Sequence, residues 1–229
     1  MAMLNLKVVF ASMVLAAAAV PSVAAAQSGA EVGVRTGYAF AAGHVGALAN
    51  SNDEKLSNWI SGQWPIWIDA GYRFNPSLYL GGYFQYGFGS VNDDQQTGCR
   101  NSNVNCSASD TRIGVMGRYH FGPTSQFSPW VGVGIGYEWT SYTVSESVAS
   151  TTTDSHWSGW EFANLQAGLD FSVASRFVLA PFISLSFDQY RHYSYTGNGG
   201  PFSLNGSGSP AKESIHEWIL IGVRAAFMP

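Results

Sequence analysis

The residues that come closest to a catalytic set are His192 and Ser194, with Glu213 or Glu217 farther along the chain. A serine acts as a nucleophile when a base lies within hydrogen-bond reach and a third group orients that base. Residues two apart in a strand share a face, so His192 and Ser194 would point the same way. The alternation of polar and apolar residues, however, places these two on the inward face and Glu217 on the outward face. We therefore expect no converging catalytic set.

Cys99 and Cys106 are the only cysteines of the chain. In an oxidising compartment such a close pair forms a disulfide, and two free thiols are the alternative. Two sulfur ligands cannot fill a four-coordinate metal site, and no histidine lies close to them in sequence. Gly132, Gly134 and Gly136 alternate along a strand with no helix after them, unlike a phosphate-binding loop. The sequence therefore predicts a disulfide, no metal site and no cofactor.

Ionised side chains are distributed selectively over a series of alternating stretches between Glu31 and Phe227. At every second position of these stretches the residues are almost all apolar or aromatic. The ionised residues lie almost wholly at the positions in between, which form the other parity of each stretch. The candidate site consists of the ionised residues Arg35, Asp69, Arg73, Arg112, Arg118, Glu138, Asp170, Asp188 and Arg224. Five positive and four negative charges suggest paired ions, since a charge-selective pore would carry an excess of one sign. Hairpin register places Arg112 opposite Glu138, and it places Arg35 near Asp69.

The alternating stretches predict eight β-strands, because successive residues of a strand point to opposite faces. The expected strands span residues 31–40, 64–74, 78–88, 111–121, 129–139, 159–171, 177–190 and 215–227. Long polar connections (41–63, 89–110, 140–158 and 191–214) alternate with short ones (75–77, 122–128 and 172–176). Pro181 lacks the N–H that a ladder bond needs, so we expect a bulge within the seventh strand.

The composition limits the class of protein. Of the 229 residues 11% are charged, against roughly 25% in ordinary soluble domains. No apolar run reaches the ~20 residues that a spanning helix needs. The one candidate, residues 8–20 after Lys7, is followed by small residues up to Ala26, which is typical of a secretory signal peptide. We therefore divide the chain into a cleaved signal peptide, residues 1–26, and one domain, residues 27–229.

The orientation of the two strand faces separates a membrane barrel from a soluble protein. Apolar residues turned outward and ions turned inward reverse the arrangement of a lipocalin-like carrier and fit a transmembrane β-barrel. Strands in lipid must close, since each orphan backbone group at an open edge costs several kcal/mol. Aromatic residues gather near both ends of the strands, where their rings favour the headgroup level. The predicted fold is all-β: an eight-stranded antiparallel transmembrane barrel, arranged as an up-and-down meander.

The chain resembles the small outer-membrane β-barrel proteins of Gram-negative bacteria, of the OmpA-transmembrane-domain, OmpX and OmpW type. The resemblance covers nearly all of residues 27–229. It rests on the signal peptide, the eight strands, the loop asymmetry and the ending Gly222-Val223-Arg224-Ala225-Ala226-Phe227. That ending is similar to the terminal assembly signal of the class, carried here by Gly222, Ala225 and Phe227, but two further residues follow it. The resemblance implies an integral outer-membrane protein with both termini in the periplasm.

The same resemblance implies a set of partners and a class of function. The partners are outer-membrane lipid and lipopolysaccharide, the barrel-assembly machinery during insertion, and an unknown ligand at the outer loops. A nucleic-acid partner is excluded because the chain has no basic stripe. We expect a structural or surface-interaction role, a lumen plugged by paired charges, and no enzyme. A narrow channel for small solutes is the alternative, and a lipid A-modifying hydrolase, matched only by His192 and Ser194, is less favoured.

Overall fold

The computed structural model describes residues 28–47, 52–123, 126–199 and 202–229. The expected signal peptide, residues 1–26, lies outside the described residues. The strands are β1 (Gly29–Gly43), β2 (Ile60–Arg73), β3 (Leu78–Val91), β4 (Val104–His120), β5 (Phe127–Glu146), β6 (Thr151–Ala174), β7 (Phe177–Gly199), β8 (Phe202–Gly208) and β9 (Ile215–Phe227). Two short 3-10 helices, η2 (Leu56–Asn58) and η3 (Thr97–Arg100), precede β2 and β4. Among the described residues, no helix has the length and apolar character needed to cross a membrane.

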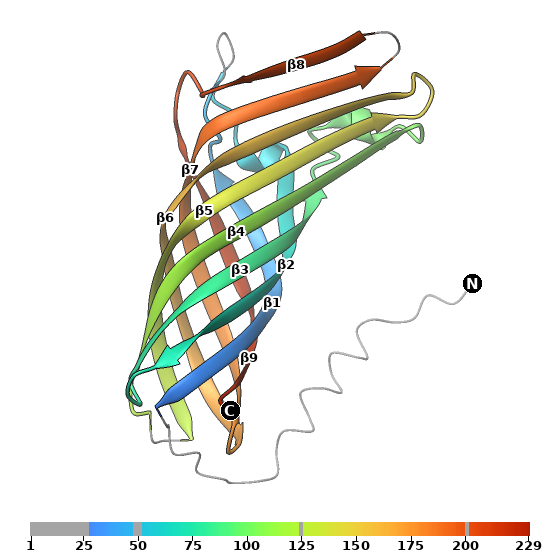
Figure 1. Ribbon diagram of the computed structural model, residues 1–229. Helices are drawn as coiled ribbons and strands as arrows, with labels where there is room; N and C mark the ends of the chain where they lie inside the picture. Colours follow the sequence, from blue (N-terminus) through green and yellow to red (C-terminus); the bar gives the residue numbers. More distant parts are fainter. Residues whose placement is uncertain (1–27, 48–51, 124–125, 200–201) are drawn as a thin grey trace, which may run out of the picture.

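The strands form a closed antiparallel barrel (Figure 1). Consecutive strands pair from β1 to β7, β7 pairs with β9, and β9 pairs with β1 to complete the ring. At the closing seam Val32 lies opposite Phe227, and Tyr38 lies opposite Ile221. The expected eight-stranded barrel is therefore confirmed. Closure gives every strand of the ring two neighbours, which satisfies the backbone groups that an open edge in lipid would leave without partners.

The two ends of the barrel differ in their connections. At one end, which we call the turn end, β2–β3, β4–β5 and β6–β7 are joined by short segments. The first of these is held by Asn75, whose Oδ1 accepts hydrogen bonds from the backbone N–H groups of Ser77 and Leu78 at 2.9 Å each. At the opposite end, the loop end, longer segments join β1–β2, β3–β4 and β7–β9. The predicted asymmetry of the connections is present, except between β5 and β6.

The strands at the loop end are longer than the sequence pattern indicates. β5 continues to Glu146 and β6 begins at Thr151, so most of the expected loop 140–158 is a hairpin extension. β7 continues to Gly199, and a ninth strand, β8, folds back along it outside the ring (Figure 1). The expected loop limits were wrong because they were read from alternation. Beyond the membrane neither face of the sheet meets lipid. The strands can pair there through their backbones without an alternation of polar and apolar side chains.

The bulge expected at Pro181 was also wrong. The register between β7 and β9 runs unbroken through Pro181, which lies opposite Val223. Toward β6 the ladder is interrupted there without a change of register, which accommodates the missing N–H. Bulges lie elsewhere, including one in β6 between Glu161 and Ala163 and one in β7 at Arg191. Each bulge changes which face the following side chains occupy.

The outer surface of the barrel is apolar. Val115, Ile135 and Ile221 are 59%, 56% and 57% exposed. Aromatic pairs gather in two bands: Tyr72–Phe74, Tyr119–Phe121, Phe127–Phe171 and Phe177–Phe227 at the turn end, and Tyr38–Trp64, Tyr86–Phe88 and Tyr137–Trp160 at the loop end. A soluble monomer rarely exposes a patch of this extent. Apolar walls between two aromatic bands are the surface that a transmembrane barrel presents to lipid.

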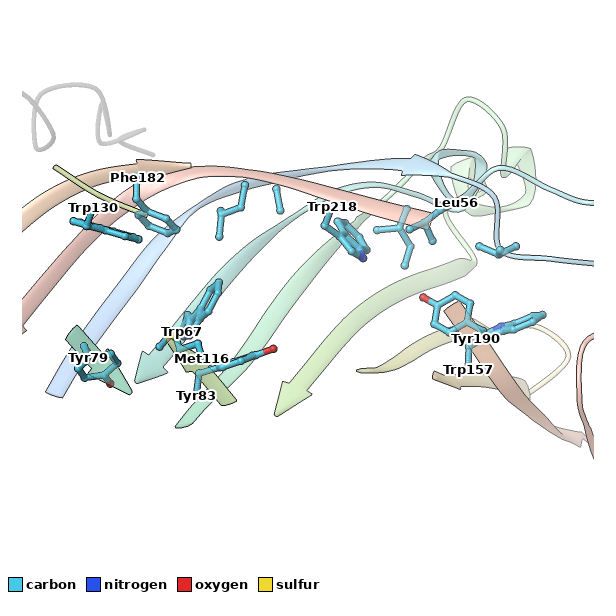
Figure 2. Close-up of a cluster of buried hydrophobic side chains, with 14 residues drawn as sticks. Leu56, Trp67, Tyr79, Tyr83, Met116, Trp130, Trp157, Phe182, Tyr190 and Trp218 are labelled. Carbon is cyan, nitrogen blue, oxygen red and sulfur yellow. The ribbon is translucent and has the colours of Figure 1, made fainter. Parts of the chain in front are cut away.

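The interior is packed with large side chains rather than left open. Trp67, Trp130, Tyr79, Tyr83 and Trp218 are all buried within the ring. Figure 2 shows them spread along the barrel, with Leu56, Trp157 and Tyr190 gathered toward the loop end. An eight-stranded barrel is just wide enough to be filled by its own side chains, and this one is filled in that way.

Candidate functional site

Charged side chains occupy the lumen in two groups. The nine ionised residues named from the sequence all point inward, and each is 4% exposed or less. The lumen also holds Glu31, Asp110, Glu161, His120 and His216, which are equally buried. We call the group near the turn end the turn-end cluster: Arg35, Arg73, Arg118, Arg224, Glu31, Asp69, Asp170 and His120. The group near the loop end is the loop-end cluster: Arg112, Asp110, Glu138, Glu161, Asp188 and His216.

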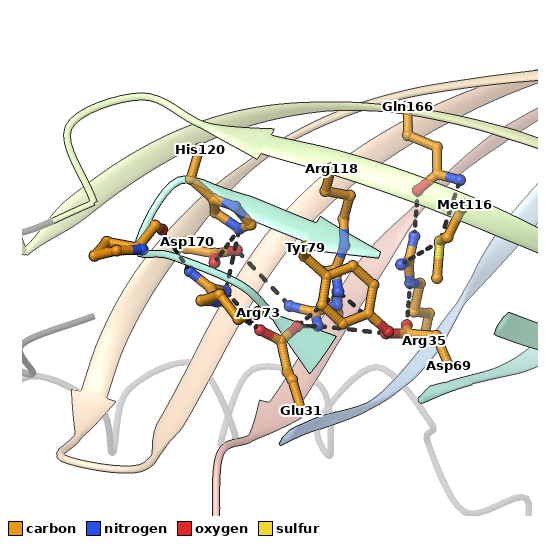
Figure 3. Close-up of polar contacts among 12 residues, drawn as sticks. Glu31, Arg35, Asp69, Arg73, Tyr79, Met116, Arg118, His120, Gln166 and Asp170 are labelled. Carbon is orange, nitrogen blue, oxygen red and sulfur yellow. Dashed lines mark hydrogen bonds and ion pairs between the residues drawn. The ribbon is translucent and has the colours of Figure 1, made fainter. Parts of the chain in front are cut away.

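Glu31 connects three arginines of the turn-end cluster (Figure 3). Its Oε2 accepts hydrogen bonds from Arg73 Nη2 at 2.6 Å and from Arg73 Nε at 3.0 Å. Its Oε1 accepts from Arg118 Nη2 at 2.6 Å and from Arg224 Nη2. These arginines come from β2, β4 and β9, so one carboxylate ties four strands together across the lumen. A buried charge requires such partners to offset its desolvation.

Asp69 and an aromatic ring hold Arg35 in place. Arg35 Nε donates to Asp69 Oδ1 at 2.8 Å, and Arg35 Nη1 donates to Gln166 Oε1 at 2.7 Å. The guanidinium carbon lies 4.5 Å from the centroid of the Trp67 ring. Aromatic faces attract cations, and more strongly where water is excluded. The N–H groups at the edge of the Arg35 guanidinium therefore bind oxygen atoms, and its flat face packs against an aromatic ring.

His120 and Asp170 complete the turn-end cluster. His120 Nε2 lies 3.2 Å from Asp170 Oδ2, and Arg224 Nη1 lies 3.9 Å from Asp170 Oδ1. Arg118 packs over the ring of Tyr79, at 3.9 Å from the centroid. The four arginines thus face three carboxylates, and every member contacts at least one partner.

Arg112 is the single arginine of the loop-end cluster, and it contacts all four carboxylates of that cluster. Its Nε lies 2.8 Å from Asp110 Oδ2, and its Nη2 lies 2.6 Å from Glu138 Oε1. Its Nη1 lies 3.3 Å from Glu161 Oε1 and 3.6 Å from Asp188 Oδ2. Only arginine offers five N–H donors in a planar fork, which lets one side chain serve several carboxylates.

The two contacts anticipated from hairpin register are present. Arg112 lies directly opposite Glu138 in the β4–β5 ladder, and their side chains join. Arg35 reaches Asp69 on the neighbouring strand β2, two residues along β2 from its own register partner Trp67. Contacts between adjacent strands therefore follow from local pairing.

Three lumen carboxylates were missed by the sequence reasoning. Glu31 shares the parity of Arg35 and could have been found from alternation alone. Asp110 lies one residue before the expected start of its strand. Glu161 lies on the lipid-facing parity of the sixth strand, and the bulge before Ala163 turns it inward. A carboxylate on an otherwise apolar strand face is itself a signal of such a bulge, since lipid tolerates no unpaired charge.

The two clusters carry opposite charge. With neutral histidines, the turn-end cluster has four arginines and three carboxylates, whereas the loop-end cluster has one arginine and four carboxylates. The nine ions named from the sequence are nearly balanced in charge as a set. Along the barrel, however, the positive and negative charges are unequally distributed. Charge is paired at the turn end and left with a negative excess at the loop end.

The lumen leaves little free volume around these clusters. A cavity bordered by Gln63, Arg112 and Ser186 measures about 10 Å³. A second, bordered by Leu56 and Tyr190 nearer the loop end, also measures about 10 Å³. Such volumes hold about one water molecule each.

The expected inward orientation of His192 and Ser194 was wrong. The bulge at Arg191 turns His192 outward, where it is exposed, and directs Tyr193 against Trp157 instead. Glu213 accepts a hydrogen bond from Arg191 at 2.7 Å. Within the described residues, no side-chain hydrogen bond joins His192 to Ser194 or to either glutamate, so the elements of a catalytic triad are not assembled.

The cysteine pair and the chain ending lie at opposite ends of the barrel. Cys99 in η3 and Cys106 in β4 form a disulfide at the loop end. Gly222, Ala225 and Phe227 lie in β9, on the seam with β1 and β7. Phe227 packs on Phe177, with ring centroids 4.8 Å apart, within the aromatic band of the turn end. Their role as an assembly signal remains a prediction.

A closed barrel with apolar walls, two aromatic bands and a charged lumen defines a class of protein, the transmembrane β-barrels. Residues 10–206 match the family model described as "Outer membrane protein beta-barrel domain", and the chain belongs to that family. A comparison with curated protein sequences finds no match.

Solved structures of outer-membrane proteins are similar to this chain. A major outer membrane protein from Thermus thermophilus is 13% identical, with a TM-score of 0.56 over 86% of this chain and 98% of that one. Neisserial surface protein A is 13% identical, with a TM-score of 0.48 over 88% and 98% of the two chains. The outer membrane protein OprG from Pseudomonas aeruginosa is 14% identical, with a TM-score of 0.48 over 89% and 98%. At these identities the likeness to the Thermus protein shows the fold alone.

Proposed function

We propose that this protein is a non-conducting outer-membrane barrel with a structural or surface-interaction role. The turn end, with both termini, faces the periplasm, and the loop end faces outward. The asymmetry of the connections supports this orientation, since outer-membrane barrels have short periplasmic turns and long outer loops. Residues 1–26 serve as the cleaved signal peptide, and lipopolysaccharide surrounds the outer aromatic band.

The observation that carries the proposal is the filled lumen. Glu31 and Arg112 each bind partners from several strands, so neither can leave its place without exposing a buried charge. Trp67 and Trp130 are each 1% exposed and occupy the space between the charges. Passage of a hydrated solute requires a continuous polar path, which interlocked ion pairs and rings do not leave.

The projecting sheet at the loop end supports the surface role. β5, β6 and β7 continue beyond the ring, and β8 adds a fourth strand at the edge of the projection (Figure 1). This projection presents ordered backbone and polar side chains away from the apolar walls. A surface of that kind suits the binding of a ligand outside the cell better than the passage of a solute through the ring.

Planar-bilayer conductance tests the proposal. We expect the purified barrel to insert without current steps, under conditions where a reference porin conducts. The lumen variant Asn164→Leu should be equally silent, as should the lipid-face control Leu165→Ala. Steps in the native protein that Asn164→Leu alters and Leu165→Ala leaves unchanged would overturn the proposal in favour of a channel for small solutes.

A further inference from the structure

The loop-end cluster contains a set of side chains that matches the requirements of a metal site. Glu138 from β5, Asp188 from β7 and His216 from β9 each offer one ligand atom, and these atoms all lie within 4.8 Å of one another. All three residues are fully buried. We propose that they bind a divalent transition-metal ion of the zinc type at the outer end of the lumen.

The charge of the cluster calls for a cation. Four carboxylates face Arg112 alone, so that with all four ionised and His216 neutral, three negative charges of the cluster would lack a counter-charge. Buried charges in proteins are paired or coordinate metals, because an isolated carboxylate in a medium of low dielectric is very costly. The turn-end cluster, with four arginines for three carboxylates, has no such deficit.

An unused ligand atom points to the same place. Asp188 Oδ1 has no hydrogen-bond partner, although the residue is fully buried. Its other oxygen, Oδ2, accepts a hydrogen bond from Ser186 Oγ at 2.7 Å. Asp170 Oδ1 in the turn-end cluster also lacks a hydrogen-bond partner, but it lies 3.9 Å from Arg224 Nη1. Buried carboxylate oxygens seldom lack a partner, so the Asp188 atom requires an explanation. A metal ion bound to Oδ1 supplies one.

The arginine does not compete for the ligand atoms. Arg112 Nη2 and Trp218 Nε1 both donate to Glu138 Oε1, at 2.6 and 3.0 Å. The second oxygen of the same carboxylate, Oε2, pairs with His216 Nε2 at 2.7 Å. Arg112 approaches Asp188 through Oδ2, the oxygen that Ser186 also binds. Arg112 and Trp218 therefore leave Glu138 Oε2 and Asp188 Oδ1 to the metal, and the contact between Glu138 Oε2 and His216 Nε2 would be replaced by a bond from each atom to the ion.

The surrounding side chains would hold these ligands in position. Ring stacking of Tyr190 on His216, with centroids 4.1 Å apart, fixes the plane of the imidazole. Ser186, Trp218 and Arg112 orient the two carboxylates through the oxygens that face away from the site. Outer partners of this kind are typical of metal sites, and their loss usually weakens binding about 10- to 100-fold.

The ligand set favours one class of ion. Imidazole nitrogen and carboxylate oxygen are both zinc ligands, and three protein ligands with a water in the fourth position form an open zinc site, whereas calcium and magnesium prefer oxygen alone. Ligands at about 2.1 Å from a tetrahedral ion lie about 3.4 Å apart, so shifts within about 1.5 Å would complete the site. The ion would join β5, β7 and β9 across the lumen.

Cobalt titration tests the inference, because Co²⁺ substitutes for zinc and absorbs visible light when it is bound in a low-coordinate site. The full chain, folded in detergent and treated with chelator, should bind one Co²⁺, develop that absorption and release the ion to Zn²⁺. Asp188→Asn and His216→Gln should each weaken Co²⁺ binding more than about 100-fold, and Ser186→Ala by about 10-fold. Heat-modifiable migration on gels verifies that each variant is folded.

Two controls separate a site from charge and from surface binding. Glu161→Gln removes one negative charge from the same cluster without touching a proposed ligand, and it should weaken Co²⁺ binding far less than Asp188→Asn does. The double variant His156→Gln/His192→Gln removes two histidines outside the lumen and should do the same. The inference is overturned if the folded native protein develops no Co²⁺ absorption. It is also overturned if Glu161→Gln weakens binding as much as Asp188→Asn, or if loss of the outer histidines abolishes it.

Discussion

At the scale of single residues, Arg112 is the side chain on which the loop-end cluster depends. It contacts Asp110, Glu138, Glu161 and Asp188, and nothing else in that cluster carries a fixed positive charge. Among the described residues, every fixed positive charge of the lumen is an arginine, and Lys55 and Lys212 lie outside the strands. A compact ammonium could not reach four carboxylates at once, whereas the planar guanidinium can.

Replacement of this residue has a predictable cost. Arg112→Ala leaves four buried carboxylates without their cation, so we expect the free energy of unfolding to fall by about 3–5 kcal/mol. Urea unfolding of the barrel in detergent, followed by tryptophan fluorescence, measures the change.

The matched control is Arg191→Ala, which breaks a 2.7 Å ion pair with Glu213 at the exposed surface. Exposed pairs contribute about 0–1 kcal/mol, so this variant should unfold almost as the native chain does. Equal losses for Arg112→Ala and Arg191→Ala would show that the loop-end cluster does not stabilise the barrel.

At the scale of elements, glycines on the inner face make room for large lumen side chains. Gly114 of β4 and Gly136 of β5 are paired in register, and the Tyr83 ring lies over both. Tyr83 Oη donates a hydrogen bond to Glu161 across this gap. A Cβ at Gly114 would lie 2.5 Å from Tyr83 Oη, closer than real Cβ atoms come. These two glycines therefore leave the space in the lumen that the Tyr83 ring occupies.

Alanine substitution separates this role from strand propensity. Gly114→Ala should lower the free energy of unfolding by about 1–3 kcal/mol, because the added Cβ would meet both the backbone oxygen of Ile135 and the Tyr83 ring, whose bond to Glu161 is lost. Gly82→Ala in the adjacent strand β3 places its Cβ 3.6 Å from the nearest atom, Gly114 O, and should change stability by less than about 0.5 kcal/mol. Urea unfolding of both variants in the same detergent makes the comparison, and a Gly114→Ala protein as stable as Gly82→Ala would contradict it.

Bulges act at the same scale and decide which side chains reach the lumen. The one before Ala163 brings Glu161 to Arg112, and the one at Arg191 removes His192 from the interior. Each inserts a single residue, which moves all following side chains to the opposite face. The first bulge thus adds Glu161 to the loop-end cluster. The second turns His192 away from the lumen, where the sequence pattern had placed it.

At the scale of the whole molecule, the apolar outer wall requires lipid or detergent. Side chains such as Val115 and Ile221 lie more than half exposed around the ring, while the charges of the lumen are buried. Water would contact the wall and not the ions, the reverse of what stabilises a soluble fold.

This arrangement predicts heat-modifiable behaviour. The mature chain should fold only with detergent or lipid, and the folded form should migrate faster on gels without boiling than after boiling. The difference arises because the closed ring resists dodecyl sulfate until heat breaks the ladder. A mature chain that stays monodisperse in buffer without surfactant would contradict the orientation of the two faces.

The sequence alone determined the eight strands of the ring and, outside the bulged segments, the direction of each face. Alternation has a period of two along the chain, so it depends only on local backbone geometry and on the contrast between lipid and lumen. For the same reason, the contacts between neighbouring strands, such as Arg112 with Glu138, could be anticipated from hairpin register. Glu31 also obeyed the pattern, since it shares the parity of Arg35.

Only the tertiary structure decided which distant charges meet. Glu31 binds Arg118 and Arg224 because closure of the ring brings β1, β4 and β9 together across the lumen. The inward turn of Glu161 depends on a bulge whose position is set by pairing on both sides of β6. The separation of charge between the two clusters follows from these long-range contacts. It could not be read from a local pattern, because closure and register are properties of all eight strands at once.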